Sequence, residues 1–133
     1  MSRRTTAIAA ALFVLALGSP LITGCTNPLA TQYFNQGVEK YEAGNYQGAI
    51  TDYDKAIEID SQSAFAYYSR GIAKSKLGDY QGAIADFNQA LEINPHDGST
   101  YLKRGNAKKD LGNYQGAIAD YNKAIEINPQ YGD

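Results

Sequence analysis

The chain of 133 residues contains one cysteine, one histidine and no tryptophan. A single cysteine excludes a disulfide within the chain, and one cysteine with one histidine is too few for a zinc site. The formal net charge is −2 and no lysine- or arginine-rich tail is present, so we expect no nucleic acid partner. The apolar run from Ala7 to Leu17 has 11 residues, whereas a membrane span needs about 20. These absences predict a protein without cofactor or metal.

The first 25 residues are arranged like an export signal. Two arginines precede the apolar run, and small residues and a proline at 18–20 end it, which is typical of a signal peptide. The string Ile22-Thr23-Gly24-Cys25 then resembles the lipobox of bacterial lipoproteins. The resemblance implies that residues 1–24 are cut off and that the Cys25 thiol receives a diacylglycerol. The alternative is an ordinary secreted protein with one free thiol, which is unusual in an exported chain.

A lipidated Cys25 implies attachment to a membrane of the bacterial cell envelope. Residues 25–29 are then the attachment site and a short tether, and residues 26–29 extend at most about 15 Å. Two or more acyl chains anchor a protein stably, whereas one holds it only marginally. In some bacteria, lipoproteins retained at the inner membrane have an aspartate directly after the lipidated cysteine. This chain has Thr26 at that place, so the resemblance leads us to expect the outer membrane.

The five residues Tyr-Gln-Gly-Ala-Ile occur at 46–50, 80–84 and 114–118, each 34 residues apart. A fixed period of this length is typical of stacked supersecondary units rather than of a single globular core. We divide the chain into the units 30–63, 64–97 and 98–131. The sequence therefore predicts three copies of one structural element in series.

Each unit reads as two short helices. In the second unit, apolar residues recur from Tyr80 to Leu91 at the spacing of one helix face. Glycine suits the left-handed conformation that ends a helix, and Asn or Asp suits the cap of the next one; these pairs are Gly44-Asn45, Gly78-Asp79 and Gly112-Asn113. Pro95 and Pro129 end the second helices, and because Ser61 takes this place in the first unit, we expect a looser turn there.

Other repeated residues predict how the helices pack. A glycine within a helix costs about 1 kcal/mol relative to alanine, so its recurrence predicts a close helix approach at Gly37, Gly71 and Gly105. Basic residues on the first helices and acidic residues on the second also recur. In an antiparallel pair they face each other, which predicts the ion pairs Arg70–Asp86 and Arg104–Asp120.

These residues resemble the tetratricopeptide repeat (TPR) family. Its motif is carried in the second unit by Tyr67, Gly71, Tyr80, Ala83, Phe87, Ala90 and Pro95, and in the third by Tyr101, Gly105, Tyr114, Ala117, Tyr121, Ala124 and Pro129. The resemblance implies an all-α fold of three helix-turn-helix pairs stacked in a right-handed superhelix. Many such domains end with a capping helix, and the third unit is followed by none, so we expect an uncovered flank.

The resemblance also implies that the first helices line a groove that holds an extended peptide. Matched by position, the candidate groove contacts are Phe34, Val38, Tyr41, Phe65, Tyr68, Ile72, Lys76, Leu102, Asn106 and Lys109. Phe34 and Val38 have an alternative role, which is to pack against the N-terminal segment. Some members of the family clamp a C-terminal carboxylate with cationic and amide side chains. Only Lys103 fits among the residues at those places, which are Phe34, Val38, Ser69, Ser99 and Lys103.

Three functions are compatible with this sequence. The leading hypothesis is a non-catalytic scaffold, tethered to a membrane, that binds a protein segment and assists the assembly of an envelope complex. The second is a structural protein that forms homo-oligomers through its uncovered third unit. The third is an enzyme, but His96 lies in a predicted loop, no phosphate-binding glycine loop is present, and the acidic residues recur with the repeat.

Overall fold

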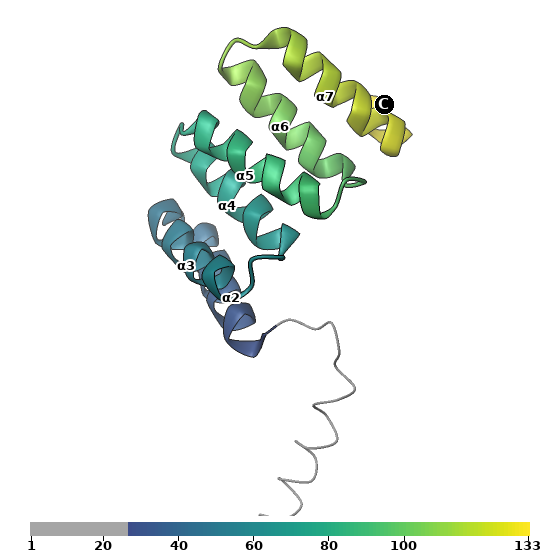
Figure 1. Cartoon of the computed structure of the whole chain (residues 1–133). Coiled ribbons are helices and arrows are strands. Elements are labelled where there is room, and N and C mark those ends of the chain that lie inside the picture. Colours follow the sequence, from purple (N-terminus) through teal and green to yellow (C-terminus); the bar gives the residue numbers. More distant parts are fainter. Residues whose placement is uncertain (1–26) are drawn as a thin grey trace, which may run out of the picture.

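Residues 27–133 form six α-helices in three antiparallel pairs, followed by one short 3-10 helix (Figure 1). The computed structural model describes these residues, so the predicted signal peptide and the lipid site at Cys25 lie outside them. The elements are α2 (Pro28–Glu42), α3 (Tyr46–Ile59), α4 (Ala64–Lys76), α5 (Tyr80–Ile93), α6 (Gly98–Asp110), α7 (Tyr114–Ile127) and η1 (Pro129–Gly132). The predicted all-α fold of stacked helix pairs is confirmed.

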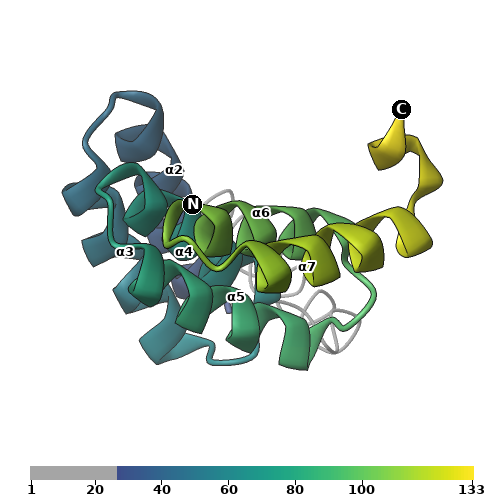
Figure 2. The same ribbon diagram turned by 90° about the horizontal axis from the view of Figure 1, so that it is seen from above.

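The three pairs stack in the order of the sequence, with α2 and α3 at one end and α7 at the other (Figures 1 and 2). Each second helix packs against the first helix of the next pair, as α3 does against α4 and α5 against α6. Among the described residues, α2 also contacts α4 and α4 contacts α6, whereas α3 makes no such contact with α5. The surface of α2, α4 and α6 is therefore the inner side of the stack, and we call it the inner face.

The predicted helix ends are confirmed. Gly44, Gly78 and Gly112 have φ angles of 79°, 81° and 81°, the left-handed region that suits glycine. The next residue caps the following helix, because Asn45, Asp79 and Asn113 each accept a hydrogen bond at 2.9 Å from the backbone N–H three residues on. Each hairpin is thus shaped by local chemistry.

The expectation of a looser turn at Ser61 is wrong. Asp60, which ends α3, has φ −131° and ψ 92°, and Asn94, which ends α5, has φ −129° and ψ 89°. The Asp60 carboxylate accepts a hydrogen bond from the Gln62 backbone N–H at 3.0 Å. Asn94 and Asn128 make the same bond two residues on, at 3.4 and 3.1 Å. This side-chain bond shapes the turn in all three units, so the proline is not required.

The recurring glycines lie where aromatic rings of the paired helix approach most closely, as predicted. A Cβ atom at Gly37 would lie 2.6 Å from the Tyr53 ring, and one at Gly71 would lie 2.7 Å from the Phe87 ring. Tyr53 and Phe87 are 2% and 1% exposed and each belongs to one of two hydrophobic clusters. Packing of these rings offsets the intrinsic cost of glycine in a helix.

The third pair differs from the others because no further helix pair of residues 27–133 packs on the outer side of α7. Tyr114 and Ile118 are 65% and 57% exposed, whereas their counterparts Tyr80 and Ile84 pack against the second hydrophobic cluster. The sequence analysis did not predict η1, which packs against α7. Its Tyr131 ring lies so close to Gly98 that a Cβ there would be 3.0 Å away.

Candidate functional site

The inner face has a pocket of about 250 Å³ between α2 and α4, which we call the tyrosine pocket. Three of its residues come from α2, one from α3 and two from α4; they are Val38, Tyr41, Glu42, Tyr53, Ser69 and Ile72. Its walls are mostly apolar, with one carboxylate and the hydroxyls of Ser69 and the two tyrosines as polar groups. Such a pocket suits an apolar side chain.

The aromatic rings of the tyrosine pocket are held by their neighbours. The Tyr53 ring packs at a tilt against Phe34, with 5.6 Å between ring centroids, and Tyr41 packs in the same way against Tyr46 at 5.2 Å. Burial raises the pKa of Tyr53, and nearby Tyr41 and Glu42 raise it further. The Tyr53 hydroxyl is therefore neutral at physiological pH.

A second pocket of about 220 Å³ lies between α4 and α6, and we call it the lysine pocket. Ile72 and Lys76 from α4 and Lys103 and Asp110 from α6 line it, above the buried Phe87. Asn106 also lines it, and its side-chain oxygen accepts a hydrogen bond from the Tyr121 hydroxyl at 2.6 Å. This bond fixes the Asn106 amide at the pocket wall.

A third pocket of about 200 Å³ lies near the start of α2 and α4. Phe34 and Phe65 line it together with small residues of α2, α3 and α4 and with Asp60 and Ser63 of the α3–α4 turn. Phe65 is 77% exposed, which is unusual for so large an apolar side chain. The inner face thus presents three concave sites along α2, α4 and α6.

The structure distributes the ten predicted groove residues over several environments. Seven line one of the three pockets, namely Phe34, Val38, Tyr41, Phe65, Ile72, Lys76 and Asn106. Tyr68 is half-buried and packs against Phe87 at 6.1 Å between ring centroids. Leu102 is half-buried and Lys109 is exposed, and neither lines these pockets. Their contact with a ligand remains a prediction.

Phe34, Val38 and Tyr41 have a second role that the sequence analysis did not assign. They pack against a hydrophobic cluster that contains Ala49 and Tyr53. Conversely, Tyr53 and Phe87 are not among the predicted groove contacts, yet they line pockets. Their buried places in the repeat motif hid this role, since the pattern shows burial but not which ring borders a cavity.

Both predicted ion pairs are confirmed; one joins α4 to α5, and the other joins α6 to α7. Arg70 contacts Asp86 at 2.6 Å and Arg104 contacts Asp120 at 2.7 Å. Lys74 and Lys108 each add a second cation to these carboxylates. Burial opposes ionisation of Asp120, but the bonds from Arg104 and Lys108 outweigh it and lower its pKa. These charges stabilise the stack.

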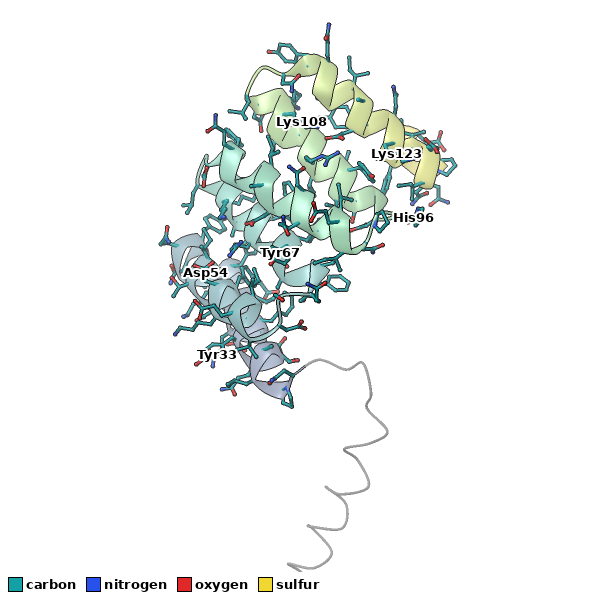
Figure 3. All side chains as sticks on the ribbon, viewed as in Figure 1. Tyr33, Asp54, Tyr67, His96, Lys108 and Lys123 are labelled. Carbon is teal, nitrogen blue, oxygen red and sulfur yellow. The ribbon has the colours of Figure 1, made fainter. Side chains whose placement is uncertain are left out.

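No catalytic or metal-binding arrangement is visible in residues 27–133. His96 is exposed in the loop between α5 and α6, on the opposite end of α6 from Lys108 (Figure 3). No group of three histidine, cysteine or acidic side chains in this part of the chain is placed to hold a metal ion. None of the described helices is both long and apolar enough to cross a membrane.

Comparison with known proteins agrees with this geometry. The family described as "Tetratricopeptide repeat" matches residues 64–97 and 99–131, and a related "TPR repeat" family matches residues 37–78. No curated protein matches the chain significantly.

Solved structures share the fold. The first TPR of Spaghetti (RPAP3), bound to the HSP90 peptide SRMEEVD, is 27% identical with a TM-score of 0.75, covering 76% of this chain and 80% of the other. The second TPR domain of human RPAP3, in complex with the HSP70 peptide SGPTIEEVD, is 26% identical with a TM-score of 0.74 over 76% and 84%. The Arabidopsis OM64 TPR domain is 28% identical with a TM-score of 0.75 over 77% and 84%. The chain belongs to the tetratricopeptide repeat family.

Proposed function

We propose that this protein is a non-catalytic adaptor that binds an extended segment of a partner protein along its inner face. The observation that carries this proposal is the row of three pockets on α2, α4 and α6, each of about 200–250 Å³. Pockets that hold drug-sized molecules have about 300–1,000 Å³. A row of smaller pockets suits successive side chains of a peptide better than one small molecule.

The similar RPAP3 domains support peptide binding, since they are bound to HSP90 and HSP70 peptides. Both of those peptides end in the acidic sequence EEVD. In this chain Phe34 and Val38 stand at two of the places where some family members bind a C-terminal carboxylate. Both side chains are apolar and line pockets of the inner face, so they offer no cation or amide to a carboxylate. The partner of this chain is therefore expected to differ from a chaperone C-terminus.

A cross-linked pull-down from native membranes tests the adaptor function. The wild-type chain is compared with a triple variant, Tyr41→Ala, Tyr68→Ala and Lys109→Ala, whose helix content is verified by circular dichroism. A matched control changes the same residue types outside the ten predicted groove contacts, as Tyr33→Ala, Tyr67→Ala and Lys55→Ala. We expect a partner that the wild type and the control capture and the triple variant loses. Equal capture by all three proteins would contradict the proposal.

We also propose that a lipid on Cys25 tethers this adaptor to the bacterial envelope, with the outer membrane as its site. The support is the lipobox resemblance of residues 22–25 and the position of Cys25 in the sequence, three residues before the start of α2 at Pro28. Mass spectrometry of the mature N-terminus measures the modification directly. We expect an acylated Cys25 in the wild type and release from the membrane in Cys25→Ser; an unmodified cysteine would contradict the tether.

Self-association through α7 is a second candidate function, favoured by the exposure of Tyr114, Ile118 and Ile125 on its outer side. Sedimentation equilibrium of residues 27–133 measures it. If α7 pairs copies, the apparent mass rises with concentration and Ile118→Glu abolishes the rise. A monomeric wild type at all concentrations would exclude this candidate.

A further inference from the structure

The tyrosine pocket and the lysine pocket adjoin on the inner face, because Ile72 of α4 lines both. One lies between α2 and α4 and the other between α4 and α6. Their volumes of about 250 and 220 Å³ suit one side chain each. A single extended segment crossing α4 would therefore place one of its side chains in each pocket.

The tyrosine pocket favours an apolar side chain. Val38, Tyr41 and Ile72 supply its walls, and the buried Tyr53 ring its floor. Glu42 is the one charged residue at this pocket, and its carboxylate repels an acidic side chain. Aromatic rings already held by neighbouring rings lose little freedom when a ligand binds, which favours them as anchors.

The lysine pocket has the opposite charge. Lys40, Lys74, Lys108 and Lys123 form ion pairs, whereas Lys76 and Lys103 form none with the described residues. Both of these lysines line the pocket, and Asp110 is its one carboxylate, so the lining residues carry one net positive charge. An acidic side chain would supply the ionic partner that both lysines lack within this part of the chain.

The arrangement of the helices sets the distance between the two sites. Neighbouring pockets are one helix apart, and packed helices lie about 8–10 Å apart. A segment extended in the polyproline II conformation advances about 3.1 Å per residue and completes one turn every three residues, so this step corresponds to about three residues, whose side chains point to the same side.

We propose that the inner face selects a partner segment with an apolar side chain for the tyrosine pocket and, about three residues away, an acidic side chain for the lysine pocket. This inference rests on the proposed function and adds the chemistry of the partner. The acidic group of this proposal is a side chain within the segment rather than a chain terminus.

An array of C-terminally amidated peptides tests this selection with the full-length chain in detergent. Each peptide carries one Phe and one Glu in a Gly-Ser background, in both orders, with one to six residues between their positions. We expect the strongest binding at a separation of about three, in one of the two orders. Replacing Glu by Gln should weaken binding about fivefold, as expected for two solvent-accessible ion pairs; replacing Phe by Ala should weaken it at least as much.

Charge-reversed proteins make the test specific to the lysine pocket. Lys76→Glu/Lys103→Glu should prefer peptides with Lys in place of Glu, while Lys55→Glu/Lys123→Glu, which has the same net charge, should keep the wild-type preference. Val38→Ser should lose the Phe preference and keep the preference for Glu. The inference is overturned if Gln replaces Glu without loss, if binding requires a free C-terminus, or if both charge-reversed proteins change preference alike.

The array separates this inference from the adaptor function itself. If the pull-down captures a partner through the inner face but the array shows no joint Phe and Glu preference, the inference fails and the adaptor function stands. If the array binds no peptide and the triple groove variant captures as much as the wild type, both fail.

Discussion

Arg70 donates two parallel hydrogen bonds to the Asp86 carboxylate, from Nε at 2.9 Å and from Nη2 at 2.6 Å. Its remaining nitrogen, Nη1, lies 2.7 Å from Asp54 of the preceding helix pair. One guanidinium thus joins α4 to α5 and also to α3. Arg104 repeats the arrangement with Asp120 and with Asn88, 2.8 Å away. Such two-pronged bonds fix geometry as well as contributing energy.

Arg104→Ala should reduce stability before it affects ligand binding. Asp120 is 5% exposed and would lose its main partner, and removing one member of a buried pair costs about 3–5 kcal/mol. We expect about 3 kcal/mol, because Lys108 still contacts Asp120 at 2.9 Å. Urea unfolding followed by circular dichroism measures the loss. An unchanged midpoint together with lost partner binding would show that Arg104 acts in recognition instead.

A double variant separates the charge from the packing. In Arg104→Met/Asp120→Leu no buried charge is left unpaired, so most of the stability lost in Arg104→Ala should return.

Gln36→Arg should stabilise the first helix pair. Gln36 occupies the place of Arg70 and Arg104 in the 34-residue repeat. Its acidic counterpart Asp52 is buried, and its Oδ2 atom lies 2.7 Å from the Lys40 ammonium, but it has no arginine partner of the kind that Asp86 and Asp120 have. An arginine there would supply further donors, and a hydrogen bond to a charged group contributes about 1.5–3 kcal/mol. We expect a gain of about 1 kcal/mol after desolvation, measured as a higher urea midpoint.

The control for this change is Gln32→Arg, one turn earlier on α2 and exposed. It adds the same charge without reaching the place that Arg70 takes in the second pair. An equal gain in both variants would point to net charge rather than to Asp52.

Gly71→Ala should destabilise the second pair although alanine is the better helix former. The new Cβ would lie 2.7 Å from the buried Phe87 ring. Overpacking of this kind costs about 1–3 kcal/mol, and alanine regains about 1 kcal/mol of helix propensity, so we expect a net loss of about 1 kcal/mol. In a double-mutant cycle with Phe87→Leu, which makes room for the methyl group, the two changes should be less harmful together than their sum. Strict additivity would contradict the contact.

Stability should fall in acid partly through Asp120. Its pKa in the folded protein lies below the ordinary value, which is about 3.9 in an unfolded chain. Above about pH 5 both states are ionised and the stabilisation is complete; as the pH falls through and below about 4, the unfolded chain takes up the proton first and the stabilisation is lost. The difference in urea midpoint between the wild type and Asp120→Asn should therefore shrink from pH 7 to pH 3. A constant difference would contradict this origin.

Much of the fold could be predicted because each feature depends on neighbouring residues. The cap of Asn45 acts on the residue three places on, and the positive φ of Gly44 needs only the absence of a side chain. Arg70 lies eight residues before Gly78 and Asp86 lies eight residues after it. The turn at Gly78 therefore places the two side chains opposite each other on the paired helices. The turn at Ser61 was predicted wrongly. It lacks the proline of the other two units, but the hydrogen bond that the Asp60 side chain accepts gives it the same shape.

The sequence alone determined the period, the helices, their ends and the family, because these depend on residues close together in the chain. Only the tertiary structure decided which side chains border a cavity. Tyr80 and Tyr114 stand in identical five-residue strings, yet α6 covers the first and no described element covers the second. Exposure depends on what packs from elsewhere in the chain, and a local pattern does not contain that neighbour.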